Sequence, residues 1–320
     1  MKYTSIVTPE WVKRNLAVDK KLRLLDCSWN LKAMEPGFTQ MAFARKHVAG
    51  AQLFDIDQVV EPGSDLPHQC PPADLFEQKV RSLGLNAGDR VICMDRDSLF
   101  GSPRVWWMFR RFGITDVSVM NGTLRDWIAI GGPTEIGGSK PVEPGNMSVL
   151  ADNHWMRKNM TDVVHHLVAK GFLPRTLLSD LPAASEPRIQ QIIDARSAER
   201  FAGVAKEPRP KVKSGHIPGS INIPHTEVLR DGRLKSMQEI WEIFQGSGVD
   251  LDSDITTSCG SGVTAATISL CLDVLGKKPE EHTLYDGSWS EYGLGSTVVG
   301  GKTVKLPIAC SDATKCPSYN

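Results

Sequence analysis

A cysteine in a glycine-rich turn is the residue of this sequence best placed to do chemistry. Cys259 is followed by Gly260-Ser261-Gly262-Val263-Thr264, and a run typical of a helix extends from Thr264 to Leu275. Glycines let the backbone turn tightly, so several amide N–H groups can point at one atom and form an anion-binding nest. The helix start adds a positive dipole end. Both effects favour thiolate over thiol, which predicts that Cys259 is an acidic nucleophile.

A buried, unreactive thiol is the alternative for Cys259, because free cysteine often packs as a small hydrophobic side chain. The two flanking glycines and the helix behind them favour the nucleophile instead. Ser261 adds a hydroxyl two residues from the sulfur.

Short apolar strands alternate with helical stretches in each half of the chain. In the first half we expect a helix that begins at Thr8-Pro9, with Thr8 as its N-cap. Further expected elements are strands at 23–29, 90–95 and 117–120, and helices at 73–83 and 104–112. This alternation predicts βαβ units and a parallel sheet. Functional sites of such sheets lie at the carboxyl ends of strands, which is where Cys259 is expected.

Four landmarks of the first half recur in the second half, 164 to 169 residues later. The pairs are Asp26 with Asp194, His47 with His216, Asp95 with Cys259, and Asn121-Gly122 with Asp286-Gly287. The near-constant offset indicates that a whole domain is duplicated. Asp95 stands where the nucleophile should be, so we expect the first copy to be inactive. His47 and His216 are interpreted as structural residues of the turn before a strand.

The predicted division is a first domain at 1–130, a linker at 131–155, a catalytic domain at 156–296 and a tail at 297–320. A length of 320 residues is typical of two domains. Five glycines and three prolines between positions 131 and 148 indicate the linker. The stretch 170–188 is interpreted as an extra loop.

Composition excludes several classes of partner. The 37 basic and 37 acidic residues give a net charge of +0, with a pI of about 7.1. We therefore expect neither nucleic acid nor an anionic membrane as a partner. No apolar run approaches the roughly 20 residues that a membrane span requires. The amino-terminal stretch lacks a secretory signal. A cytoplasmic location is the expectation, and a mitochondrial one stays open.

Seven cysteines are scattered along the chain without a Cys-x-x-Cys pair. This pattern favours neither a zinc ribbon nor a thioredoxin-type motif. Free thiols in a reducing compartment are the expectation. Cys310 and Cys316 are interpreted as two free surface thiols, with a redox pair as the alternative. We expect no metal and no organic cofactor.

The loop Cys259-Gly260-Ser261-Gly262-Val263-Thr264-Ala265 resembles the active-site loop of the 3-mercaptopyruvate sulfurtransferases, in the rhodanese superfamily. The resemblance implies two tandem rhodanese-like α/β domains, the first non-catalytic. It also implies that Cys259 takes sulfur from 3-mercaptopyruvate as a persulfide and releases pyruvate. The acceptor would be thioredoxin, a small thiol or cyanide.

The resemblance carries over to residues outside the cysteine itself. Arg200 and Arg209 match the arginines that bind the substrate carboxylate, a task suited to guanidinium forks. Asp57, in Phe54-Asp55-Ile56-Asp57, would form a proton relay with Ser261 and Cys259, and His68 would face the substrate. Gly260, Gly262, Val263 and Thr264 would supply the backbone nest. Arg196 is interpreted instead as a structural partner of Asp194.

The charge of the loop selects among donors. Thiosulfate-specific rhodaneses carry Arg and Lys where this chain has the neutral Gly260 and Ser261. A neutral loop with remote arginines favours an organic carboxylate such as 3-mercaptopyruvate. A thiosulfate:cyanide sulfurtransferase and a persulfide carrier or binding module of the rhodanese type are the alternatives. A phosphatase with a similar loop is disfavoured, because it would need an arginine where Ala265 stands.

Overall fold

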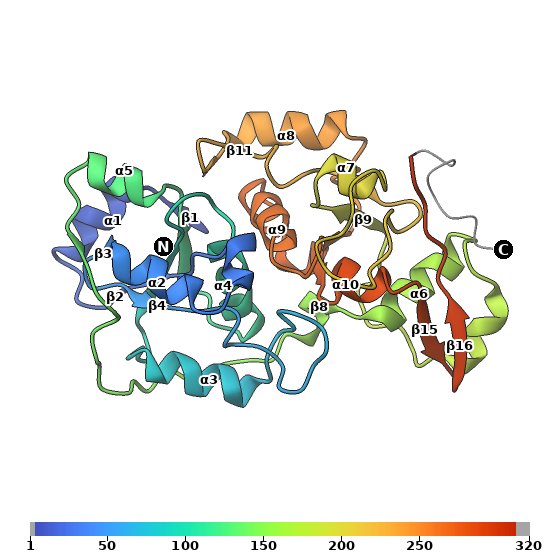
Figure 1. Cartoon of the computed structure of the whole chain (residues 1–320), viewed down its shortest axis with the longest axis horizontal. Helices are drawn as coiled ribbons and strands as arrows, with labels where there is room; N and C mark the ends of the chain where they lie inside the picture. The colour runs from blue at the N-terminus through green and yellow to red at the C-terminus, as the bar shows by residue number, and fades with distance from the viewer. Residues whose placement is uncertain (1–3, 312–320) are drawn as a thin grey trace. The chain divides into compact units, whose positions relative to one another are not determined.

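The computed structural model describes residues 4–311 and forms two compact units. Within the described residues, unit 1 comprises the chain up to residue 63, 70–153 and 229–235. Unit 2 comprises 64–69, 154–228 and the chain from 236 onward. Figure 1 shows each unit as a sheet with helices around it.

Unit 1 is built on a five-stranded parallel sheet in the order β1-β6-β5-β2-β4. Its strands are β1 (Ile6–Val7), β2 (Leu22–Asp26), β4 (Gln52–Leu53), β5 (Arg90–Met94) and β6 (Val117–Met120). Its helices are α1 (Pro9–Leu16), α2 (Phe38–Arg45), α3 (Ala73–Ser82), α4 (Ser102–Arg111) and α5 (Leu124–Ala129), with a 3-10 turn η1 (Leu31–Met34). A short antiparallel pair joins β3 (His47–Val48) to β7 (Thr134–Glu135).

The core of unit 1 lies on both faces of this sheet. On one face Val12 of α1 and Trp127 of α5 belong to a buried cluster with sheet residues such as Ile92. Aromatic side chains of α3 and α4 pack together, and Phe76 and Phe109 meet edge to face with ring centroids 5.1 Å apart. The predicted start of α1 is confirmed, because the Thr8 hydroxyl accepts a hydrogen bond from the Trp11 amide at 3.2 Å.

Unit 2 has a second five-stranded parallel sheet, in the order β10-β9-β13-β14-β8. Its strands are β8 (Arg157–Lys158), β9 (Gln191–Asp194), β10 (Ile221–Asn222), β13 (Ile255–Ser258) and β14 (His282–Tyr285). Its helices are α6 (Met160–Ala169), α7 (Ala198–Phe201), α8 (Met237–Gly246), α9 (Ala265–Val274) and α10 (Ser288–Tyr292). Short 3-10 turns are η2 (His154–Met156), η3 (Arg175–Asp180) and η4 (Pro279–Glu281), and a hairpin joins β15 (Ser296–Val299) to β16 (Lys302–Lys305).

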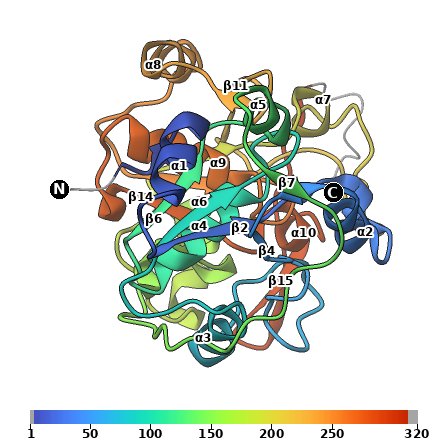
Figure 2. The same cartoon turned by 90° about the vertical axis from the view of Figure 1, so that its left-hand side faces the viewer.

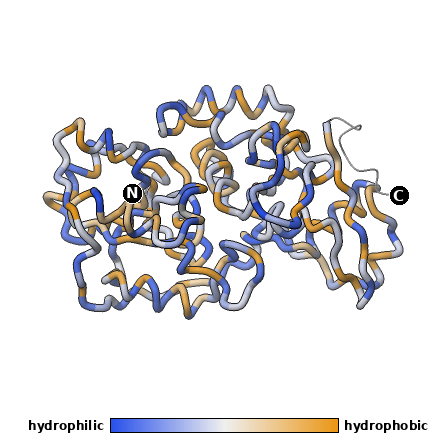
Figure 3. Tube along the Cα trace, viewed as in Figure 1, coloured by the Kyte–Doolittle hydropathy of each residue, from blue (hydrophilic) through white to orange (hydrophobic). Residues whose placement is uncertain are grey.

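The helices of unit 2 differ in how deeply they are buried. α9 is buried from Ala265 to Leu272, whereas α8 buries only Ile240 and Phe244. Figure 3 shows the corresponding hydropathy, with hydrophobic residues gathered along α9 and an alternating pattern along α8. A helix that is apolar all round belongs inside a core. The cysteine loop therefore ends at a helix that is held in place by its packing in the core.

The two sheets confirm the predicted duplication, because they match strand for strand in the orders given above. The histidine landmarks match as well. His47 Nδ1 lies 2.9 Å from the Phe43 carbonyl oxygen, and His216 Nδ1 lies 2.7 Å from that of Phe201. Each ring stacks on the phenylalanine whose carbonyl it contacts, at 3.7 Å between centroids. Both histidines are structural, as predicted.

A hairpin from the second half of the sequence belongs to unit 1. Its strands are β11 (Leu229–Arg230) and β12 (Arg233–Leu234). Arg233 donates to both carboxylate oxygens of Asp126, and this contact above all holds the pKa of Asp126 down to about 2. The Leu234 amide donates to Asn121 Oδ1 at 2.8 Å. Conversely, residues 64–69 belong to unit 2, where Gln69 donates to the Asp286 carbonyl at 3.0 Å.

The segment expected to be a linker is packed on unit 1 as far as residue 153. The Gly145 and Met147 amides donate to the carbonyls of Arg81 and Leu85 at 2.8 and 3.0 Å. A Cβ atom at Gly145 would lie 1.9 Å from the Leu85 carbonyl oxygen, so only glycine allows this approach. Figure 2 shows this segment (green) passing along the edge of the same unit near β7 and α3.

The described part of the tail packs on unit 2. Ala309 and His216 exchange backbone hydrogen bonds at 3.0 and 2.8 Å. Cys310 is disulfide-bonded, so the prediction of a free thiol there is wrong. The pairing of Ala309 with His216 orders the segment that carries this cysteine, which is therefore not a loose surface thiol. Cys316 lies outside the described residues.

The stretch 170–188 forms η3 and packs against α6. Leu173, Leu177 and Leu181 contact the buried cluster that α6 shares with β14 and α10. A cavity of about 280 Å³ lies beside these elements, lined by Asp162, His165, His166, Val168, Ala169, Arg175, Leu178, Ala184, Ser185, Arg188 and Ile189. None of these residues belongs to the Cys259 loop. No helix among residues 4–311 is long and apolar enough to span a membrane.

Candidate active site

Cys259 follows the last residue of β13, at the carboxyl end of the central strand of unit 2. β9 and β14 flank this strand, and the Ala195 amide donates to the Ser258 carbonyl at 2.8 Å. The Cys259 side chain lies where open α/β sheets place functional groups. The residue is only 2% exposed, so the loop around it decides what can reach the sulfur.

The backbone of the cysteine loop is held by the start of α10. The Cys259 amide donates to Ser288 Oγ at 3.1 Å, and the Cys259 carbonyl accepts from the Trp289 amide at 2.9 Å. The Gly260 carbonyl accepts from both the amide and the hydroxyl of Ser290, at 2.8 and 2.5 Å. Sequence analysis identified the neighbouring Asp286-Gly287 as a landmark of the repeat but missed this bracing role of Ser288 to Ser290.

The remaining loop residues turn the chain into α9. Gly262 has φ +78°, a left-handed conformation that favours glycine. Val263 and Thr264 are buried, and Thr264, the N-cap residue, makes no side-chain capping hydrogen bond. No side chain of the cap therefore satisfies the first amides of this helix. An anion-binding role for Gly260, Gly262, Val263 and Thr264 stays a prediction that this geometry allows.

Ser261 meets His68. The Ser261 Oγ lies 2.8 Å from His68 Nδ1, and the two residues are 5% and 7% exposed. His68 has φ +59°, which is uncommon for a residue with a side chain. The structure thus brings His68 to the cysteine loop within unit 2, a contact across 193 positions of sequence. The resemblance pointed to His68 as a residue that faces the substrate.

Asp57 lies in unit 1. Its Oδ2 accepts from Trp29 Nε1 at 2.9 Å, and its amide donates to Asp55 Oδ1 at 3.0 Å. Both of these contacts lie within unit 1. The proposed relay of Asp57, Ser261 and Cys259 remains a prediction, whereas the Ser261 contact within unit 2 is with His68.

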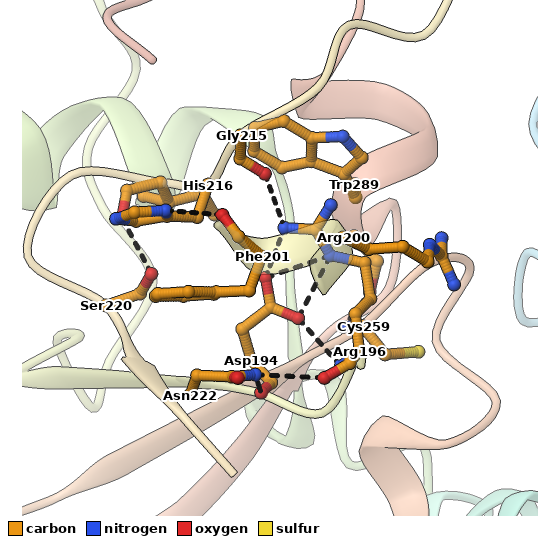
Figure 4. Close-up of polar contacts among 12 residues, drawn as sticks. Asp194, Arg196, Arg200, Phe201, Gly215, His216, Ser220, Asn222, Cys259 and Trp289 are labelled. Atoms are coloured by element: carbon orange, nitrogen blue, oxygen red, sulfur yellow. Dashed lines mark hydrogen bonds and ion pairs between the residues drawn. The ribbon is translucent and has the colours of Figure 1, made fainter. Parts of the chain in front are cut away.

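Arg200 faces the cysteine loop. Its Nε donates to Glu207 Oε1 at 3.1 Å and its Nη2 donates to Glu207 Oε2. A Cβ atom at Gly260 would lie 3.1 Å from Arg200 Nη2, so this glycine leaves room for the guanidinium. Figure 4 shows the Arg200 side chain reaching to the same side as the Cys259 sulfur. Arg209 follows in the same segment and is half-buried, and its binding role stays a prediction.

Arg196 is structural, as predicted. It donates to both carboxylate oxygens of Asp194, to Glu207 Oε1 at 2.9 Å and to the Gly215 carbonyl at 2.8 Å (Figure 4). Its guanidinium also lies 4.2 Å from the ring centroid of Trp289. Burial acts to lower the pKa of Arg196, but the two carboxylates outweigh it and raise the pKa.

Comparison with known proteins identifies the architecture. A family model described as a rhodanese-like domain matches residues 8–130 and 177–294. The chain belongs to the rhodanese family.

Curated relatives of two kinds match almost the whole chain. The 3-mercaptopyruvate sulfurtransferase of Escherichia coli (strain K12) is 34% identical over 92% of this chain and 96% of that protein. The thiosulfate sulfurtransferase of Rattus norvegicus is 34% identical over 91% of this chain and 92% of that protein. The crystal structure of SseA from Escherichia coli, described under 3-mercaptopyruvate sulfotransferases, is 35% identical with a TM-score of 0.74, and covers 90% of this chain and all of that one. This rhodanese-family chain is a sulfur-transferring enzyme.

Two residues near the site of this rhodanese escaped sequence analysis. Glu207 binds Arg196 and Arg200 together, although its side chain is only 3% exposed. The only sequence feature that could have pointed to Glu207 is its position two residues before Arg209, in Glu207-Pro208-Arg209. His225 donates its amide to the Ala195 carbonyl, and burial, with a smaller effect of Arg200, lowers the pKa of its imidazole.

Other cysteines of the rhodanese fold serve the core. Burial raises the pKa values of the Cys271 and Cys27 thiols well above the usual range for cysteine, so both stay thiols. Within residues 4–311 no group of three or more His, Cys, Asp and Glu side chains is arranged to hold a metal ion.

Proposed function

We propose that this rhodanese-family enzyme moves the sulfur of 3-mercaptopyruvate to a thiol acceptor through a persulfide on Cys259. The observation that carries the proposal is the neutral Gly260-Ser261 pair after Cys259, with Arg200 lying against Gly260. Relatives named for mercaptopyruvate and for thiosulfate are about equally identical to this chain. Overall similarity therefore does not select the donor, and the loop is the better guide.

The first half-reaction forms the persulfide. The Cys259 thiolate attacks the substrate sulfur, the S–C bond breaks, and its electron pair leaves on carbon as the enolate of pyruvate. The enolate then takes a proton and becomes pyruvate. Ser261 is the proposed proton donor, with His68 in hydrogen-bond contact with its hydroxyl and Asp57 as the further relay member.

The second half-reaction returns the enzyme to its starting state. The thiolate of the acceptor attacks the outer sulfur of the persulfide and carries it away, which restores the Cys259 thiolate. Thioredoxin or a small thiol is the proposed acceptor, and cyanide would leave as thiocyanate. No cofactor takes part in this scheme, and we propose a cytoplasmic setting for it.

Arg200 and Arg209 are proposed to hold the carboxylate of the donor. A guanidinium has two edges that can grip an oxygen pair. In Arg200 one edge, Nε and Nη2, is bound to Glu207. The other edge, Nη1 and Nη2, is the part of the side chain nearest Gly260. A carboxylate bound there would place the remainder of a small donor beside the cysteine loop.

The test compares kcat/KM for 3-mercaptopyruvate and thiosulfate with one shared acceptor, in the wild type and in Cys259→Ser. We expect a strong preference for mercaptopyruvate that disappears in the variant, and a mass increase of one sulfur atom on Cys259 after donor treatment. A preference for thiosulfate would support the second candidate, a thiosulfate sulfurtransferase. Absence of both turnover and added sulfur would favour a binding module of the rhodanese type.

A further inference from the structure

Glu207 lies at the centre of a buried chain of charges in unit 2. Asp194 binds Arg196, Arg196 binds Glu207, and Glu207 binds Arg200. The side chains of the first three are 0–3% exposed, and that of Arg200 is 21% exposed. Two carboxylates thus face two guanidinium groups, and the chain of four is neutral as a whole.

Arg200 is the end of this chain that faces the cysteine loop. Its remaining edge offers N–H donors toward Gly260, but its charge is balanced by the carboxylate of Glu207. Such a group can still form hydrogen bonds to a monoanion. It provides little net attraction for a dianion, whose second charge would meet a neutralised site of low dielectric constant.

We propose that Glu207 is a positioning residue that fixes Arg200 over Gly260 and sets the charge of the site, so that a monocarboxylate donor is preferred to a dianion such as thiosulfate. This inference rests on the proposed function, since it concerns the donor of the same reaction. It assigns donor selectivity to a buried carboxylate outside the Cys259 loop, in addition to the neutral residues of the loop itself.

The decisive variant is Glu207→Gln, which keeps the size of the side chain and removes its charge. We expect the ratio of kcat/KM for thiosulfate to that for 3-mercaptopyruvate to rise about tenfold, the order expected when one nearby counter-charge is lost. The gain for thiosulfate should shrink as ionic strength rises, because salt screens the new net charge. If Glu207 has a purely structural role, kcat/KM for both donors should fall together, and the ratio and its salt dependence should stay unchanged. That result would overturn the proposal.

Matched controls separate charge from packing. Glu199→Gln removes an equal charge from an exposed position of α7 and should leave the ratio at its wild-type value. Glu207→Asp keeps the charge but shortens the side chain, so the ratio should stay near that of the wild type even if both rates fall. A ratio that changes equally in Glu199→Gln would contradict a specific role of Glu207.

A double variant tests whether Glu207 acts through Arg200. An Arg200→Gln background leaves the chain of charges with one net negative charge, and adding Glu207→Gln makes it neutral again, so Glu207→Gln should raise the ratio much less there than in the wild type. If Glu207→Gln alone fails to fold, the comparison can be made between Arg200→Gln and the double variant, because the double variant removes both charges of the Glu207–Arg200 ion pair. An undiminished effect of Glu207→Gln in that background would refute the assignment.

Calorimetric titration with pyruvate and with sulfate keeps this inference distinguishable from the proposed function. We expect Glu207→Gln to strengthen sulfate binding relative to pyruvate by about tenfold, again the order expected for one nearby counter-charge. If the wild type turns over neither donor but this shift occurs, the proposed reaction fails while the role of Glu207 stands. If turnover occurs and the shift does not, the role of Glu207 fails alone.

Discussion

The loop after β5 in unit 1 and the loop after β13 in unit 2 occupy equivalent places in duplicated sheets, yet their backbone amides are used differently. In unit 1, Asp95 accepts from the amides of Phe100, Gly101 and Ser102 at 2.9 to 3.1 Å. The Ser102 hydroxyl donates to the same carboxylate at 2.5 Å. The loop of unit 1 thus binds an anion that belongs to its own chain.

The cysteine loop of unit 2 is held from outside. Ser288, Trp289 and Ser290 bind the backbone of Cys259 and Gly260. No carboxylate replaces the sulfur at the end of β13. The comparison teaches that one topology can be used in two ways, because the residue after the strand is a carboxylate bound by its own loop in unit 1 and a cysteine thiol in unit 2.

The largest expected difference between the two loops is chemical. Cys259→Ser should lower sulfur transfer by at least about three orders of magnitude, as removal of a covalent nucleophile commonly does. Stopped assays of thiocyanate formation would measure it, because cyanide is the simplest acceptor. Asp95→Cys in the Cys259→Ser background should restore nothing, since the unit 1 loop lacks the equivalents of Ser261 and Arg200. Recovery of turnover there would show that topology alone suffices.

The two arginines after β9 should separate stability from binding. Arg196→Met should lower the free energy of unfolding by about 3–5 kcal/mol, because it leaves the buried carboxylate of Asp194 without its partner. Chemical denaturation followed by tryptophan fluorescence would report the loss. A fully stable variant with weakened donor binding would mean that Arg196, not Arg200, serves the substrate.

Arg200→Gln should instead raise KM for 3-mercaptopyruvate by about 10- to 100-fold with little change in stability, since a charge-assisted contact to the donor is lost. Steady-state kinetics over a range of donor concentrations would show the change. Arg175→Gln is a suitable control, because it removes an exposed guanidinium of the same unit away from the cysteine loop. An equal rise of KM in both variants would point to a general effect of charge.

Asp95→Asn should destabilise the protein by about 1–3 kcal/mol, because an amide cannot accept all the hydrogen bonds that the carboxylate accepts. Burial raises the pKa of Asp95 from 3.8 to about 6, although its hydrogen bonds act in the other direction. The folded state therefore holds this proton more tightly than the unfolded state, and the cost of the buried charge declines as pH falls from 6 toward 4. Denaturation of wild type and variant across this range should show their difference changing with pH, whereas sulfur transfer at neutral pH should be kept.

Three histidines of unit 2 should respond to acid in the opposite sense to Asp95, with a smaller effect for each residue. Burial lowers the pKa of His166, His216 and His225 below the ordinary value of 6.5. The unfolded chain then binds these protons first, so their contribution to stability declines as pH falls below 6.5. His166→Gln should flatten the pH dependence of the unfolding midpoint below that value. An unchanged slope would show that this imidazole does not take up its proton on unfolding.

Residue type and spacing were enough to predict the architecture. The recurrence of Asp26, His47 and Asp95 as Asp194, His216 and Cys259 is visible without coordinates, because a duplicated fold keeps its turns and strand ends in register. The cap at Thr8 and the helix after Cys259 are likewise local, since a side-chain cap or a glycine turn involves neighbours in sequence. The Cys259-Gly260-Ser261 loop indicated the chemistry for the same reason.

Only the tertiary structure determined which distant groups meet. The contact of Ser261 with His68, the binding of Arg196 and Arg200 by one Glu207, and the packing of 229–235 on unit 1 join residues that no periodicity relates. In an unfolded chain the Glu207 carboxylate could meet many different arginines. Folding determines that it binds Arg196 and Arg200. The disulfide of Cys310 was likewise not predicted from spacing, and backbone hydrogen bonds between Ala309 and His216 place the segment next to it on unit 2.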